Sequence, residues 1–154
     1  MRFSLSAVII AVAALAASVA QAGTVEVKDA WIRATPPGAT TAAGYAVIVN
    51  HGFTTDRLMG GHTAVAGSVE PHQTTMAGGV MRMRAIPGGL AIGASAAAHL
   101  SPNGDHLMLI GLKRPLRAGE HVRVVLDFTR AGAVTADFVV RDGASGGGMG
   151  GMHM

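Results

Sequence analysis

The chain has 154 residues, a formal net charge of +3 and no cysteine. This length suits one domain with its own core, and the lack of cysteine excludes a disulfide framework and a thiolate copper site, including the blue-copper type. The basic residues are scattered, with no stripe of interleaved aromatics, so we expect no nucleic-acid partner.

The first 22 residues have the features of a secretory signal peptide. Arg2 supplies a short basic region, residues 5–17 form an apolar run too short to span a bilayer comfortably, and Ala20-Gln21-Ala22 fits the small-x-small cleavage rule. We therefore predict a signal peptide over residues 1–22, cleavage after Ala22 and export to the periplasm. An uncleaved anchor is the alternative. Because no cysteine is present to carry a lipid, we expect no membrane anchor after cleavage.

The rest of the chain alternates between apolar and polar residues in short runs. Examples are TVEVK at residues 24–28, AGYAVIVN at 43–50, HVRVVLDF at 121–128 and AVTADFVV at 133–140. A period of two, rich in valine and bounded by glycine and proline turns, indicates half-buried strands, whereas no segment has a convincing helical period. We predict an all-β domain over residues 23–142, with about eight or nine strands in an antiparallel sandwich or Greek-key barrel.

The last twelve residues, GASGGGMGGMHM at 143–154, are dominated by glycine. Such a segment cannot bury apolar surface, so we predict a flexible tail. Its methionines and histidine form an auxiliary candidate site that would capture copper, with Cu(II) held by the histidine nitrogen. The residues of this candidate are Met149, Met152, His153 and Met154.

Methionine and histidine also cluster within the predicted strands. The segment HQTTMAGGVMRM begins at His72 and ends at Met83, and HLM covers residues 106–108. Strand residues two apart point the same way, so His106 and Met108 share a face. A hairpin through the AGG turn at residues 77–79 would bring His72 and Met83 together.

This combination of side chains favours Cu(I). Thioether sulfur is a soft ligand that suits Cu(I), whereas zinc sites prefer cysteine, histidine and carboxylate. A thioether needs no deprotonation and forms no disulfide in an oxidising compartment. Neutral ligands would also leave the ion exchangeable, as a carrier requires.

A single methionine is more often a core residue, and a single histidine more often lies at the surface. We expect no ligand role for the isolated cases, Met59, His51, His62, His99 and His121. Trp31 and Tyr45 are expected to be core anchors, and Met76 a loop residue. Met81 shares a face with Met83 and would substitute for it or flank it. Glu70 is a candidate acceptor that would orient the His72 imidazole.

The order and spacing of these residues resemble the PCu(A)C family of periplasmic copper chaperones. The chain has His72, ten residues, Met83, twenty-two residues and then His106-Leu107-Met108. The second interval is one residue longer than in the family pattern, which we assign to the SPNGD turn at residues 101–105. Further likeness lies in DAWIRATPPGATTAAGY (29–45), MRMR (81–84) and GLKRPLRAGE (111–120).

The resemblance implies a cupredoxin-like β-barrel that binds one Cu(I) through His72, Met83, His106 and Met108. It also implies copper delivery to the cytochrome c oxidase copper subunit, alongside a Sco-type copper protein. We expect a monomer without enzymatic activity. Periplasmic copper sequestration or resistance is the main alternative, and a non-metal β-sandwich interaction domain is the other.

Overall fold

The computed structural model describes residues 24–143, which form ten strands and no α-helix. This confirms the all-β prediction, and no helix within these residues is long and apolar enough to cross a bilayer. The predicted signal peptide and the auxiliary ligands Met149, Met152, His153 and Met154 lie outside the described residues. The strands are β1 (Val25–Arg33), β2 (Thr41–Asn50), β3 (Asp56–Thr63), β4 (Ala66–Ala77), β5 (Val80–Ala85), β6 (Leu90–Ile92), β7 (Ala97–His99), β8 (His106–Leu112), β9 (His121–Phe128) and β10 (Gly132–Arg141).

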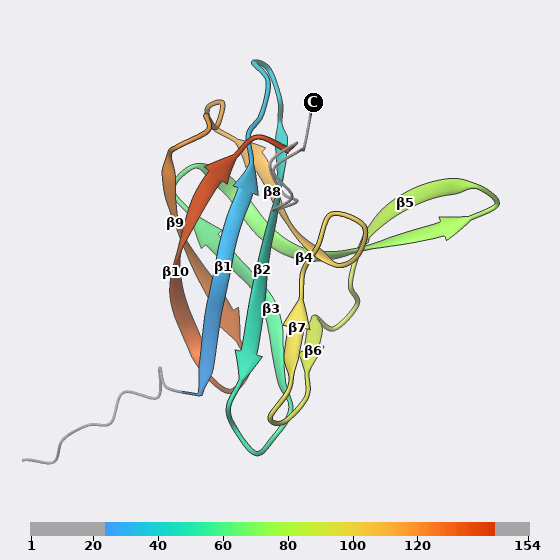
Figure 1. The fold of residues 1–154 in the computed structure, drawn as a ribbon, viewed down its shortest axis with the longest axis vertical. Helices are drawn as coiled ribbons and strands as arrows, with labels where there is room; N and C mark the ends of the chain where they lie inside the picture. The colour runs from blue at the N-terminus through green and yellow to red at the C-terminus, as the bar shows by residue number, and fades with distance from the viewer. Residues whose placement is uncertain (1–23, 144–154) are drawn as a thin grey trace, which may run out of the picture.

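The strands form a single sheet that closes into a barrel. The order β4-β8-β2-β1-β10-β9-β3 returns to β4 through a β3–β4 pairing, while β5 and β6 extend the sheet and β7 pairs with β2 (Figure 1). The expected antiparallel arrangement needs one correction, because β1 and β10 run parallel. The cupredoxin-like barrel architecture is confirmed.

Along the strands of the barrel, alternate apolar residues fill the interior as the alternation predicts, whereas β5, which lies outside the barrel, is exposed throughout. In β9 the inward residues are Val122, Val124, Leu126 and Phe128, all buried. In β8, Leu107 and Leu109 are buried in the interior. Because side chains alternate along a strand, the residues on either side of Leu107 lie on the opposite face of the sheet.

A bulge in β1 changes which residues face the interior. The register with β2 shifts between Lys28 and Trp31, and Asp29 in this interval has a positive φ of 50°. A bulge adds one residue to a strand and so reverses the alternation beyond it. Trp31 is thereby set against Tyr45, with their ring centroids 4.6 Å apart. Tyr45 is buried, as predicted for a core anchor, and Trp31 is half-buried beside it.

The β4–β5 hairpin projects from the barrel wall (Figure 1). Its two-residue turn consists of Gly78 and Gly79, both with positive φ, as tight hairpins with the favoured twist require. The hairpin predicted from the AGG turn is therefore confirmed. The loop prediction for Met76 was wrong, because Met76 lies within β4 and pairs with Met81.

Tyr45 offers a spectroscopic test of this packing, because it is the only tyrosine in the chain. Burial raises the pKa of the Tyr45 phenol, and the nearby positive charge of Arg33 opposes part of that rise. In an ultraviolet titration, the denatured chain should ionise with a midpoint near the ordinary tyrosine value of about 10. The midpoint of the folded protein should lie above it. The folded state holds this proton more tightly, so the free energy of unfolding should fall as the pH rises from the midpoint of the denatured chain through that of the folded protein. Tyr45→Phe should remove the part of this fall that comes from the phenol. Equal midpoints for the folded and denatured chains would contradict the burial.

Candidate metal centre

The four ligands predicted from the sequence lie on one face of three adjacent strands. His72 on β4 is directly opposite His106 on β8. Met108 follows two residues along β8, and Met83 lies diagonally from His72 because Ala85 is the direct partner of His72 on β5. Directly opposite Cβ atoms in a sheet are about 5 Å apart and diagonal ones about 7–8 Å, so long side chains can converge between them. Strand pairing thus brings together residues from three separate segments.

His72 has one ring nitrogen engaged and one free. Its Nε2 lies 3.2 Å from a carboxylate oxygen of Glu70, the acceptor predicted from the sequence. Its Nδ1 is buried and has no hydrogen-bond partner in the structure. With Nε2–H donated to Glu70, Nδ1 carries a lone pair and remains available to a metal ion.

His106 is arranged in the complementary way. Its Nδ1 lies 3.2 Å from the carbonyl oxygen of Gly104, and its Nε2 is buried without a partner. The side chain belongs to a residue that is only 2% exposed, and its ring centroid lies 5.9 Å from that of His72. Donation of Nδ1–H to the carbonyl leaves the Nε2 lone pair free. Unpaired buried nitrogens are costly in a folded protein, so the two on these adjacent rings call for an explanation.

The two methionines differ in exposure. Met108 is half-buried, whereas Met83 on the projecting hairpin is 52% exposed. Their thioethers are neutral and soft, and flexible side chains allow the sulfur atoms to adjust their positions. The arrangement therefore combines two fixed imidazoles with two adaptable thioethers.

Thr74 is a polar residue of this face that the sequence analysis missed. It lies two residues after His72 and directly opposite Met83. Its hydroxyl oxygen is buried without a hydrogen-bond partner in the structure, like the two ring nitrogens. The alternation of β4 already placed Thr74 on the face of His72, so the signal was present in the sequence.

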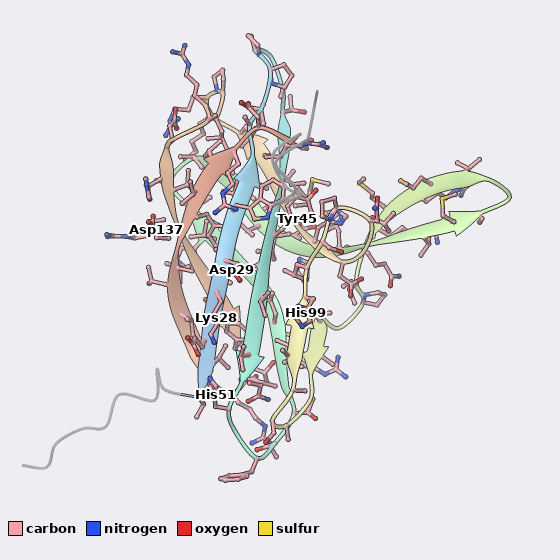
Figure 2. The ribbon with its side chains drawn as sticks, viewed as in Figure 1. Lys28, Asp29, Tyr45, His51, His99 and Asp137 are labelled. Atoms are coloured by element: carbon pink, nitrogen blue, oxygen red, sulfur yellow. The ribbon has the colours of Figure 1, made fainter. Side chains whose placement is uncertain are left out.

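The histidines expected to have no ligand role are exposed and lie on other strands or in loops. Three of them are close to surface carboxylates: His51 Nε2 is 3.0 Å from Glu26, His121 Nδ1 is 2.7 Å from Asp137 and His62 Nδ1 is 3.5 Å from Asp127. The hydrogen bond with His51 lowers the pKa of Glu26. Figure 2 shows His51 near the end of the barrel remote from the β4–β5 hairpin, and His99 on β7 between that end and the base of the hairpin. Within residues 24–143, no group of three histidine, cysteine or carboxylate side chains is placed to hold a metal ion.

A surface pocket of about 230 Å³ lies away from the histidine–methionine cluster. It is lined in part by Asn50 and Asp56, whose side chains are buried. The Asp56 carboxylate accepts hydrogen bonds from the backbone N–H groups of Arg57, Arg130 and Ala131 at 2.8–2.9 Å. The Asp56 carboxylate is thus hydrogen-bonded within the protein, so its burial beside the pocket does not require a bound ligand.

Comparison with known proteins gives consistent results. The family model described as "Putative lipoprotein LpqE-like" matches residues 25–140. A curated protein of Leifsonia xyli subsp. xyli, "Putative lipoprotein Lxx21020", is 35% identical over 122 residues, which cover 79% of this chain and 72% of that protein.

Solved structures of PCuAC domains share the fold. The copper-bound PCuAC domain from PmoF2 is 27% identical with a TM-score of 0.64, covering 78% of this chain and 94% of that domain. The solution structure of CuI-DR1885 from Deinococcus radiodurans is 34% identical with a TM-score of 0.62, covering 83% of this chain and 87% of that one. The apo PCuAC domain from PmoF1 is 26% identical with a TM-score of 0.65, covering 78% of this chain and 95% of that domain.

Proposed function

The chain belongs to the LpqE-like family of PCuAC proteins, and from that premise we propose that it is an exported copper chaperone. It carries one Cu(I) ion on the face formed by β4, β5 and β8. The ligands are His72 Nδ1, His106 Nε2 and the sulfur atoms of Met83 and Met108. Two similar proteins are copper-bound PCuAC structures, which supports copper as the cargo.

The observation that carries the proposal is the pair of unpaired ring nitrogens. His72 Nδ1 and His106 Nε2 are both buried and lack partners, while the other nitrogen of each ring is held by Glu70 or by Gly104. A metal ion between the two rings would satisfy both lone pairs. The external hydrogen bonds would fix the tautomer and orientation of each ring, as at other histidine metal sites.

The donor set favours Cu(I) over other ions. Zinc also takes imidazole but prefers thiolate or carboxylate as its other ligands, and the hard cations prefer carboxylate and water, whereas thioether and imidazole together suit Cu(I). Glu70, the carboxylate beside the site, is already engaged by His72. Thioether and imidazole ligands are neutral and attract the cation less strongly than an anionic thiolate does, so a competing thiolate can remove the copper ion.

Accessibility favours a carrier over a storage protein. Met83 is 52% exposed and lies on a hairpin that projects from the barrel, so an acceptor can approach this ligand directly. We propose transfer by ligand exchange, in which an acceptor group replaces Met83 first and the buried histidines last. The acceptor proposed is the cytochrome c oxidase copper subunit, with a Sco-type protein acting alongside. Periplasmic sequestration or resistance remains the rival function, while a non-metal interaction domain would leave the unpaired nitrogens unexplained.

A transfer experiment tests the carrier function. Cu(I)-loaded protein is mixed with the apo copper domain of the oxidase subunit, the two are separated, and the copper in each is measured. Thiolate holds Cu(I) more tightly than thioether does, so most of the copper should move to the acceptor.

Sequestration would be favoured if this protein keeps its copper in the mixture. It would also require that cells without the protein have normal oxidase activity and are sensitive to copper. Met83→Leu should weaken the retention of Cu(I) and speed its transfer, because the ligand that the acceptor displaces first is already absent. Met59→Leu is the matched control, since Met59 is 51% exposed and lies on β3.

The C-terminal residues Met149, Met152, His153 and Met154 are proposed as an auxiliary copper-capturing arm that also accepts Cu(II) through His153. Their composition supports this, because thioethers and an imidazole are spaced by glycines. This arm would supplement the barrel site.

A further inference from the structure

The β4–β5 hairpin carries three methionines on one face. Met76 lies directly opposite Met81, and Met83 lies opposite Thr74 in the next pair on the same face, closer to the barrel. The other face of the hairpin carries Gln73 opposite Arg84 and Thr75 opposite Arg82, so the two faces differ sharply in charge. The methionine face has no charged residue between the turn and Thr74. Figure 2 shows sulfur atoms along this hairpin and at its base.

These methionines have no packing role in the barrel. Met76 is 65% exposed and Met81 is 54% exposed, and neither belongs to the hydrophobic core. Exposing large apolar side chains on a projecting two-stranded hairpin gives no core packing in return. A soft ligand role explains their residue type, since leucine or valine would fill space equally well.

The strand register lets the three sulfur atoms converge. Met76 and Met81 are directly opposite, and Met83 is diagonal to Met76. The corresponding Cβ separations in a sheet are about 5 Å and 7–8 Å. Each methionine has three rotatable bonds with which to close these gaps. Met83 is also diagonal to His72, so it adjoins both the histidine site and the outer pair.

We propose that Met76 and Met81, together with Met83, form a second and weaker Cu(I) site on the hairpin, through which copper enters and leaves the histidine site. This proposal rests on the proposed function, since it needs Cu(I) at His72, His106 and Met108. Loading starts with Cu(I) on the outer thioethers. His72 and His106 then displace the sulfur atoms of Met76 and Met81 while Met83 remains bound. Each histidine step breaks one copper–sulfur bond as a copper–nitrogen bond forms, and the sulfur atom of Met108 then adds as a fourth ligand to the three-coordinate ion. Copper stays Cu(I) throughout, so no oxidant or reductant is needed.

The test uses a chain of full length in which the tail ligands are removed by Met149→Ser, Met152→Ser, His153→Ser and Met154→Ser. In this background, Met76→Leu with Met81→Leu removes the outer pair, and Met59→Leu is the matched control. Loading from a weak Cu(I) complex is followed by stopped flow, and methionine methyl resonances are followed by NMR during a titration with Cu(I). Holding the ion next to its final site makes the last step intramolecular, so loss of the outer pair should slow loading by about tenfold or more. The equilibrium affinity for the first Cu(I) should change by less than about twofold, because the histidine site is intact.

The methyl signals of Met76 and Met81 should shift when Cu(I) exceeds one equivalent, and native mass spectrometry should show a second, weaker ion that the double variant lacks. Unshifted methyl signals and unchanged loading, with tight binding of the first ion, would overturn this proposal and leave the proposed function intact. Absence of tight binding even in the background chain would instead overturn the proposed function. If the double variant loads normally but transfers poorly to the acceptor, the methionines form a protein-docking surface and the second site is rejected.

Discussion

Replacing His106 with leucine is expected to abolish tight Cu(I) binding while leaving the apo protein at least as stable as the native chain. His106 is 2% exposed, and its Nε2 is buried without a partner. An unsatisfied buried polar atom costs about 1–3 kcal/mol, so an apolar side chain of similar size relieves a cost that only a bound ion offsets. His106 would therefore lower the stability of the apo protein, and this cost would be offset by the Cu(I) binding that the side chain makes possible.

Two measurements check this result. A competition titration against a Cu(I) chelator should show affinity reduced by more than about a hundredfold, because a ligand is lost where even outer contacts are worth 10- to 100-fold. Thermal unfolding should show an apo Tm equal to or above that of the native chain and no rise on adding Cu(I), since a ligand that does not bind cannot stabilise. X-ray absorption of the loaded native protein, with the tail ligands replaced, should show both sulfur and nitrogen neighbours. If the His106→Leu variant instead has a much lower apo Tm and an unchanged Cu(I) affinity, His106 is only a core residue.

Asp56→Ala is expected to have the largest effect on stability. The carboxylate of Asp56 accepts three backbone N–H groups, from Arg57 next to it and from Arg130 and Ala131 in the turn between β9 and β10. The residue is 3% exposed, so alanine would leave these donors without an acceptor and without ready access to water. At about 1–3 kcal/mol for each unsatisfied group, we expect a loss of at least about 3 kcal/mol.

Urea denaturation should show this loss as a lower midpoint with an unchanged slope. Asp127→Ala is the matched control, because the Asp127 side chain is 48% exposed and forms an exposed ion pair with His62. Its effect should stay within about 0.5 kcal/mol. Asp56→Asn should be intermediate, since the amide keeps one oxygen acceptor but presents an N–H₂ group to one of the donors. Equal effects of Asp56→Ala and Asp127→Ala would show that the buried carboxylate does not hold the β9–β10 turn.

Some features of the protein follow from the sequence alone. The period-two alternation of β8 and β9 separates Leu107 and Val122 from the outward residues, because side chains of a strand alternate whatever the strand pairs with. The paired glycines at 78 and 79 required a tight turn, and that turn predicted the β4–β5 hairpin. The grouping of His106 with Met108 on one face is equally local. The membership of His72 and Met83 in the same cluster came from the hairpin and from the family resemblance.

The rest depended on contacts between distant segments. Nothing local indicated that β1 would pair with β10 in parallel, or that β3 would close the barrel on β4. The bulge at Asp29 reverses the alternation of β1 and places Trp31 against Tyr45, which the uninterrupted pattern of residues 24–28 did not reveal. Met76 was expected in a loop because propensity alone does not tell how far a hairpin extends, and its strand pairing with Met81 decided otherwise.

The tertiary structure also decided which nitrogen of each histidine is free. The composition identified imidazole and thioether as donors, since their chemistry belongs to the residue types themselves. Whether His72 offers Nδ1 and His106 offers Nε2 depends on Glu70 and on the carbonyl group of Gly104. Those hydrogen bonds exist only once the strands and the loop before β8 are in place. The sequence by itself therefore determined which donor atoms the protein can offer. The folded barrel determined the direction of each lone pair, because orientation depends on hydrogen bonds formed only in three dimensions.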